Sequence, residues 1–295
     1  MPETKDTRAA VLISPAELQE RMTAGDRVVL LDVRWSLAEP DGHKYYVAGH
    51  IPGAQFVDLD ADLAAPASPE AGRHPLPDLG RLQQAARAWG IDDGDTVVVY
   101  DDAGGTSAAR AWWLLRWAGV ADVRILDGGL AGWSELGGIL EDGDVAVAPG
   151  NVTLTDGHMP VADADEAARV GQAGVLLDAR AAERYTGDSE PVDVRAGHIP
   201  GARSAPTSEN LDEAARFRST DELRQQYAQM GVAADSDVVV YCGSGVTAAH
   251  EVAALESIGV HARLYPGSFS QWAADAARPV ATGLEEPGSS TEEPA

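Results

Sequence analysis

Short apolar segments alternate with longer alanine-rich segments along most of the chain. Apolar runs occur at Val28–Asp32, Val97–Tyr100 and Val123–Leu126, and runs of this kind are typical of parallel strands that are covered on both faces. The segments Thr106–Ala118 and Thr247–Ser257 are rich in alanine and free of proline, so both are predicted to be helices. Strands that alternate with helices predict an α/β fold in which each sheet is mainly parallel and is flanked by helices.

Two copies of one pattern follow each other along the chain. The heptapeptide AGHIPGA occupies residues 48–54 and recurs unchanged at residues 196–202. In both copies it follows a Leu-Leu-Asp-x-Arg segment and precedes, in the same order, a Val-Val-Val-Tyr segment, a glycine-rich turn and a Gly-x-x-x-x-Trp segment. The chain therefore contains a tandem duplication, and its 295 residues are enough for two domains with separate cores.

The duplication and the local composition together predict the domain boundaries. The first predicted domain spans residues 11–140 and the second spans residues 161–283. Between them, residues 141–160 contain several prolines and glycines and are predicted to be a linker. Residues 1–10 and the acidic, polar residues 284–295 are predicted to be disordered tails.

The charge of the chain limits its partners. The sequence holds 47 acidic residues against 22 lysines and arginines, which gives a formal net charge of −25. A surface this negative repels nucleic-acid phosphates and anionic lipids, so we expect neither a nucleic acid nor a membrane as a partner. Because the sequence has no apolar stretch long enough to span a bilayer and no secretory signal, we expect a cytoplasmic protein.

The single cysteine, Cys242, is the strongest candidate for chemistry. One cysteine can form neither an intramolecular disulfide nor a Cys-x-x-Cys pair nor a cysteine zinc site, so no metal site is predicted. Cys242 ends a predicted strand, where open α/β sheets bind ligands, and a loop with Gly243 and Gly245 follows it. Backbone N–H groups of this loop, through Val246 to the helix that starts near Thr247, are expected to form an anion cradle that favours the thiolate.

Two chemistries use a thiolate in such a loop. A cysteine phosphatase needs an arginine six residues after the cysteine to grip phosphate, and this position holds Ala248. Sulfur transfer needs only one cysteine, because the thiolate accepts a sulfane sulfur and the loop stabilises the resulting persulfide. The sequence therefore favours sulfur transfer through Cys242. An inert buried thiol is the alternative reading of a lone cysteine.

In these features the chain resembles the two-domain rhodanese-like sulfurtransferases, which include thiosulfate and 3-mercaptopyruvate sulfurtransferases. The resemblance spans about residues 11–280 and rests on both AGHIPGA segments, both Gly-x-x-x-x-Trp segments, Arg-Tyr-Thr-Gly at residues 184–187 and the Cys-Gly-Ser-Gly-Val-Thr-Ala loop. It implies an enzyme without a metal or organic cofactor. It also implies a small anionic sulfur donor and a thiol, cyanide or thioredoxin-like acceptor. Asp101 aligns with Cys242, so the first domain is expected to be catalytically silent.

The resemblance also suggests the sulfur donor. Neutral residues, Gly243 and Ser244, follow the cysteine, which is similar to the mercaptopyruvate members, whereas thiosulfate members place basic residues there. In the mercaptopyruvate group a serine, a histidine and an aspartate assist cleavage of the C–S bond, and the matching residues are Ser244, His74 and Asp60. 3-Mercaptopyruvate is therefore the expected donor. A thiosulfate:cyanide sulfurtransferase remains the alternative enzyme, and a non-catalytic rhodanese-like binding module is the alternative of another class.

Arginines are expected to bind the donor, since guanidinium groups suit carboxylates and sulfonates. Arg184 matches the family's donor-binding arginine. The family's second arginine has no direct counterpart, and Arg195 is predicted to replace it from a shifted loop. Residues that recur in both copies or follow helical spacing are predicted to be structural; they are His50, His198, Asp32, Arg34, Asp178, Arg180, Trp112, Trp113 and Trp117.

Overall fold

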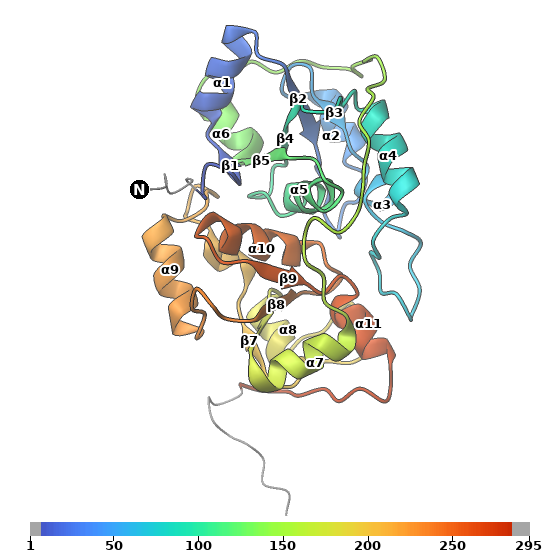
Figure 1. Ribbon diagram of the computed structural model, residues 1–295, viewed down its shortest axis with the longest axis vertical. Coiled ribbons are helices and arrows are strands. Elements are labelled where there is room, and N and C mark those ends of the chain that lie inside the picture. The colour runs from blue at the N-terminus through green and yellow to red at the C-terminus, as the bar shows by residue number, and fades with distance from the viewer. Residues whose placement is uncertain (1–6, 285–295) are drawn as a thin grey trace, which may run out of the picture.

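The computed structural model describes residues 7–284 and contains one parallel sheet in each half of the chain (Figure 1). The first sheet contains, in spatial order, β1 (Leu12–Ile13), β5 (Asp122–Leu126), β4 (Thr96–Tyr100), β2 (Val28–Asp32) and β3 (Gln55–Phe56). The second contains β7 (Ala202–Ser204), β6 (Val175–Asp178), β8 (Val238–Tyr241) and β9 (Ala262–Leu264). Each sheet with its helices is called a domain below.

The helices follow the order of the duplication. Those of the first domain are α1 (Pro15–Ala24), α2 (His43–Ala48), α3 (Leu59–Asp62), α4 (Leu79–Ala88), α5 (Ala108–Trp117) and α6 (Gly129–Glu135). Those of the second are α7 (Ala164–Ala173), α8 (Ala182–Thr186), the 3-10 helix η1 (Thr207–Asn210), α9 (Thr220–Gln229), α10 (Thr247–Ser257) and α11 (Ser268–Ala274). Residues 136–163, which join the domains, contain isolated bridges but no helix or strand.

The predicted α/β fold with parallel sheets flanked by helices is confirmed. The three apolar runs form β2, β4 and β5, and α10 has the predicted bounds. Helix α5 begins at Ala108 rather than at Thr106, because the backbone N–H groups of Ser107 and Ala108 donate to the carboxylate of Asp101. This contact keeps the preceding residues in the loop.

The expected N-terminal tail is partly ordered. Residues 7–10 form a turn in which Thr7 Oγ1 donates to the carbonyl of Ser257, 3.1 Å away. The guanidinium of Arg8 donates to the backbone carbonyls of Phe217 and Arg218 in the second domain. The prediction of disorder is therefore wrong for residues 7–10, since tertiary hydrogen bonds hold them. Residues 1–6 and 285–295 lie outside the described residues.

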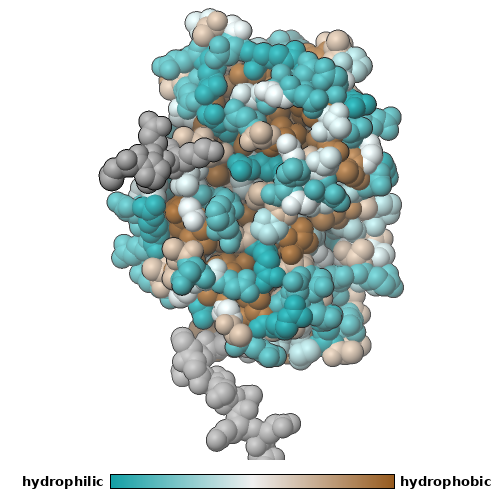
Figure 2. Space-filling model, viewed as in Figure 1, coloured by the Kyte–Doolittle hydropathy of each residue, from teal (hydrophilic) through white to brown (hydrophobic). Residues whose placement is uncertain are grey.

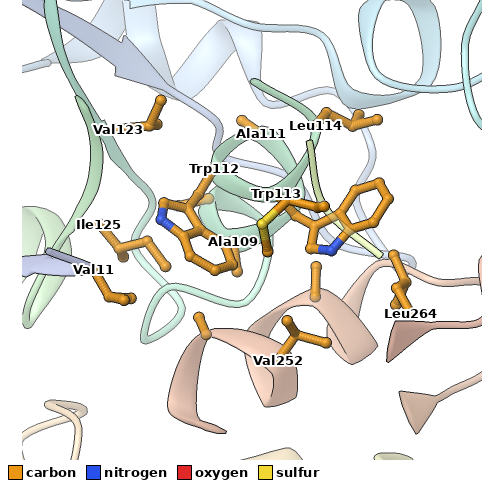
Figure 3. Close-up of a cluster of buried hydrophobic side chains, with 14 of the residues drawn as sticks. Val11, Ala109, Ala111, Trp112, Trp113, Leu114, Val123, Ile125, Val252 and Leu264 are labelled. Carbon is orange, nitrogen blue, oxygen red and sulfur yellow. The ribbon is translucent and has the colours of Figure 1, made fainter. Parts of the chain in front are cut away.

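One hydrophobic cluster spans the two domains, and each domain has a further buried cluster of its own. Helices α5 and α10 lie side by side between the sheets, and one continuous cluster of buried side chains draws on both domains (Figure 1). Trp112 and Trp113 of α5 are fully buried, and Figure 3 shows Trp113 beside Val252 of α10 and Leu264 of β9. Both tryptophans are therefore structural, as predicted, and Trp113 packs at the domain interface. Hydrophilic residues cover much of the face shown in Figure 2.

The repeated charges are structural, as the sequence predicts. Arg34 lies 2.7 Å from the carboxylate of Asp32, and Arg180 lies 2.6 Å from that of Asp178. All four side chains are buried. Each guanidinium also donates to the backbone carbonyl of the first glycine in its AGHIPGA copy, so the pair ties the strand end to that turn. The histidine of each AGHIPGA copy is likewise buried and bonds through Nδ1 to a backbone carbonyl.

A buried carboxylate next to the domain interface is expected to make stability depend on pH. Glu251 of α10 is fully buried; its Oε2 accepts a hydrogen bond from Asn210 Nδ2 at 2.6 Å, while its Oε1 has no hydrogen-bond partner among the described residues. Burial raises the pKa of Glu251 to about 7. Unfolding frees this group to ionise at its ordinary value near 4.5, so its contribution to stability falls as pH rises from there to 7.

Replacement of Glu251 by glutamine should remove this dependence. Relative to the variant, the wild type should lose roughly 2–3 kcal/mol of unfolding free energy between pH 5 and pH 8. Urea unfolding of both proteins at the two pH values measures the difference. A gap between the proteins that stays constant with pH would show that Glu251 is ionised at both pH values in the folded state.

Candidate active site

Cys242 lies at the carboxyl end of β8, in a loop that returns into α10. Its side chain is 2% exposed, and its Sγ accepts a hydrogen bond from the backbone N–H of Gly245 at 3.1 Å. Gly245 has a φ of +82°, and a Cβ there would lie 2.6 Å from the carbonyl oxygen of Pro266. Only glycine therefore fits this turn. The loop is fixed from the other side by Ser268, whose Oγ accepts from the backbone N–H of Cys242.

The equivalent loop of the first domain carries its own anion. Strand register aligns Tyr100 with Asp32 and Tyr241 with Asp178, so Asp101 and Cys242 follow equivalent strand ends. The carboxylate of Asp101 accepts hydrogen bonds of 2.8–3.0 Å from the backbone N–H groups of four loop residues, Ala103, Gly105, Ser107 and Ala108. The loop of this fold can thus surround an anion with backbone donors, which supports the cradle expected around Cys242.

The structure brings Asp60, His74 and Ser244 together beside Cys242. Ser244 lies two residues after the cysteine, and its Oγ is 2.7 Å from His74 Nδ1 of the first domain. The other ring nitrogen, Nε2, lies 3.1 Å from Asp60 Oδ1 on the short helix α3. Trp35 Nε1 donates to the second oxygen of Asp60 at 3.0 Å and holds the carboxylate in place. The three residues therefore form a continuous chain across the domain interface.

The surroundings of His74 favour a neutral imidazole. The ring is buried, and burial is the main cause that lowers its pKa, with a further contribution from the positive charge of Arg110. The carboxylate of Asp60 opposes this effect only in part. At neutral pH the ring can therefore accept a proton from a neighbour and return it.

Arg110 of α5 is a functional candidate that the sequence analysis missed. Its guanidinium is fully buried and donates to the backbone carbonyls of Leu63, His74 and Gly245, so it links the histidine loop to the cysteine loop. Burial lowers the pKa of Arg110 to about 10, an effect that the charge of Cys242 opposes, and no carboxylate among residues 7–284 forms an ion pair with its guanidinium. Arg110 therefore places a buried positive charge next to the cysteine loop. Its position within a tryptophan-rich helix suggested only packing.

Arg184, the predicted donor-binding arginine, lies over the cysteine loop. A Cβ on Gly243 would lie 3.3 Å from Arg184 Nη1. The guanidinium is held by Glu190 at 2.8 Å and by Asp193 at 2.9 Å, and both carboxylates are buried. Arg184 therefore has a fixed position next to Gly243, the residue that follows Cys242.

Arg195 does not reach the site. Its guanidinium donates to the backbone carbonyls of Trp272, Ala273, Asp275 and Arg278 at 2.7–2.9 Å. These contacts satisfy backbone carbonyls at the end of α11. They also occupy the guanidinium N–H groups of Arg195 that would otherwise bind a sulfur donor. The expectation that Arg195 replaces the second donor-binding arginine is therefore corrected.

Arg73 of the first domain also lies over the cysteine loop. A Cβ on Gly243 would lie 2.7 Å from Arg73 Nη2, and the guanidinium forms an ion pair with Asp193. No sequence motif marks Arg73, although it directly precedes His74. Of the other predicted loop residues, Val246 packs in the core and Thr247 begins α10.

The described residues contain neither a metal-binding cluster nor a membrane-spanning helix. Residues 7–284 contain no cluster of three histidine, cysteine, aspartate or glutamate side chains that could hold a metal ion. None of their helices is long and apolar enough to cross a bilayer.

Comparisons with known proteins agree with the duplication. The family model described as "Rhodanese-like domain" matches residues 14–136 and 162–275. A Mycobacterium tuberculosis protein provisionally named thiosulfate sulfurtransferase SseB is 48% identical over 94% of this chain and 98% of its own. A Pseudomonas aeruginosa protein provisionally named 3-mercaptopyruvate sulfurtransferase is 44% identical over 93% and 99%. The crystal structure of the 3-mercaptopyruvate sulfurtransferase SseA from Escherichia coli superposes with a TM-score of 0.78 at 33% identity, covering 87% of this chain and 98% of that one.

Proposed function

The chain belongs to the rhodanese-like family and is a sulfurtransferase, and on this premise we propose that Cys242 transfers sulfur from 3-mercaptopyruvate. The acceptor is a thiol, cyanide or a reduced thioredoxin-like protein. The first domain, with Asp101 in place of the cysteine, is catalytically silent and supplies Asp60 and His74. A purely binding role is disfavoured, since relatives over most of the chain are named as enzymes.

The observation that carries the donor assignment is the 2.7 Å contact between Ser244 Oγ and His74 Nδ1 next to Cys242. The Cys242 thiolate attacks the donor sulfur, so an S–S bond forms while the C–S bond breaks and its electron pair passes to the pyruvate enolate. The methylene carbon of this enolate needs a proton to become the methyl group of pyruvate, and the thiol of the donor can supply it. Ser244 passes the thiol proton to His74, Asp60 stabilises the imidazolium, and the same groups return the proton to the enolate carbon. Pyruvate leaves and the persulfide anion remains.

Thiosulfate needs no such chain. When the thiolate attacks its outer sulfur, the S–S bond of the donor breaks and sulfite leaves with the electron pair as a stable anion. A proton relay beside Cys242 therefore gives mercaptopyruvate an advantage that thiosulfate cannot use. The name of the Mycobacterium tuberculosis relative makes thiosulfate the second candidate donor.

Steady-state kinetics with both donors and cyanide as the common acceptor test the assignment. We expect kcat/KM for 3-mercaptopyruvate to exceed that for thiosulfate by at least about tenfold, which corresponds to roughly 1.4 kcal/mol in transition-state stabilisation. A preference for thiosulfate in the same buffer would overturn the donor assignment and remove the purpose of the relay.

A further inference from the structure

We propose that Arg73 is the second guanidinium that binds the donor's carboxylate, and that Asp193 occupies this carboxylate position until the donor displaces it. The inference rests on the proposed function for the identity of the donor. It places half of the donor-binding site on the silent domain.

The geometry brings two guanidinium groups to one point. A Cβ on Gly243 would lie 2.7 Å from Arg73 Nη2 and 3.3 Å from Arg184 Nη1. Gly243 directly follows the nucleophile, so an anionic group held there leaves the adjoining part of a short donor near Sγ. Two forked guanidinium groups suit the two oxygens of a carboxylate better than one flexible ammonium group does.

Asp193 already shows how a carboxylate fits between them. Its Oδ1 pairs with Arg73 and its Oδ2 with Arg184, and its side chain is only 3% exposed. Burial raises the pKa of Asp193, because the charged carboxylate has lost its contact with water. Keeping this carboxylate ionised in the pocket therefore costs free energy. Arg73 Nε is also buried and has no hydrogen-bond partner among the described residues, which leaves a donor for an incoming anion.

The charges at this point favour a singly charged group. Arg73 and Arg184 are matched by Asp193 and Glu190, and both carboxylates are buried. A donor carboxylate that displaces the Asp193 carboxylate replaces one negative charge with another, so the net charge of the pocket does not change. The dianion thiosulfate would bring an uncompensated charge into the pocket. The pair Arg73 and Asp193 therefore also disfavours thiosulfate.

Alkylation of Cys242 tests this site without any sulfur transfer. Iodoacetate and iodoacetamide have nearly the same shape, but only iodoacetate carries a carboxylate, and the chain has a single cysteine to react. The second-order rate constant for iodoacetate divided by that for iodoacetamide therefore measures carboxylate binding beside Sγ. In the wild type, Arg73 and Arg184 should raise the ratio.

The ratio should fall at least about tenfold in Arg73→Met and in Arg184→Met. Arg73→Lys, which keeps the charge but loses the forked geometry, should give an intermediate value. Arg169→Met is the matched control, because Arg169 is 71% exposed on α7 and, within residues 7–284, pairs only with its neighbour Glu166. This control should leave the ratio unchanged.

A ratio that falls in Arg184→Met but stays at the wild-type value in both Arg73 variants would overturn the inference. A ratio that stays unchanged in all variants would also overturn it. If the wild type transferred no sulfur, the proposed function would fail, yet the alkylation ratios would still decide whether Arg73 binds a carboxylate. With active enzyme, Arg73→Met should raise KM for 3-mercaptopyruvate about tenfold and change kcat less.

Discussion

Replacement of Cys242 by serine is expected to abolish sulfur transfer, with a loss in kcat/KM of more than about 10³-fold. The serine hydroxyl cannot hold a sulfane sulfur as a persulfide, while the loop donors and the buried guanidinium of Arg110 remain. Stability should change little, by about 1 kcal/mol or less, because serine fills nearly the same volume. The decisive measurement is intact mass after treatment with 3-mercaptopyruvate. The wild type should gain about 32 Da, the mass of one sulfur atom on the only cysteine.

The matched control is Asp101→Asn, at the equivalent position of the first domain. Its carboxylate is surrounded by backbone donors in the same way, but it carries no thiol. This variant should still gain one sulfur atom per chain. A mass gain in Cys242→Ser, or its loss in a folded Asp101→Asn protein, would show that sulfur is carried elsewhere or that the first domain takes part in the chemistry.

The fold and the position of Cys242 at a strand end could be predicted because both depend on local patterns. Continuous apolar runs mark the parallel strands, and a repeated heptapeptide marks the second copy. The carboxyl ends of parallel strands meet at one edge of a sheet, so a cysteine placed directly after Tyr241 had to lie at the ligand-binding edge. Glycine at position 245 then identified the tight loop.

The arginines that lie over the cysteine loop could not all be predicted, because their positions depend on how the domains pack. Arg195 directly precedes the second AGHIPGA segment and is therefore close in sequence to the family's second arginine. However, four backbone carbonyls at the end of α11 bind its guanidinium. Arg73 lies 170 residues before Gly243 and reaches it only because α5 and α10 pack together. The ordered residues 7–10 have the same explanation, since their partners lie in the second domain.

Replacement of His74 by alanine is expected to separate the two donors. Turnover of 3-mercaptopyruvate should fall at least about 10²-fold in kcat/KM, the usual contribution of a positioned acid or base. Turnover of thiosulfate should fall less than about threefold, since sulfite leaves without a proton. The physical reason is specific to the site: His74 is the only described residue that joins Ser244 to Asp60, at 2.7 and 3.1 Å.

The measurement is kcat/KM for both donors in wild type and variant, with cyanide as acceptor in one buffer. His261→Ala is the control, because His261 is 80% exposed and also pairs with a carboxylate, that of Glu256. It should change neither value. Equal losses for both donors in His74→Ala would mean that the histidine only shapes the loop around Cys242. A loss confined to 3-mercaptopyruvate can arise only if the step that needs a proton depends on His74, and it would therefore establish the relay as part of the reaction.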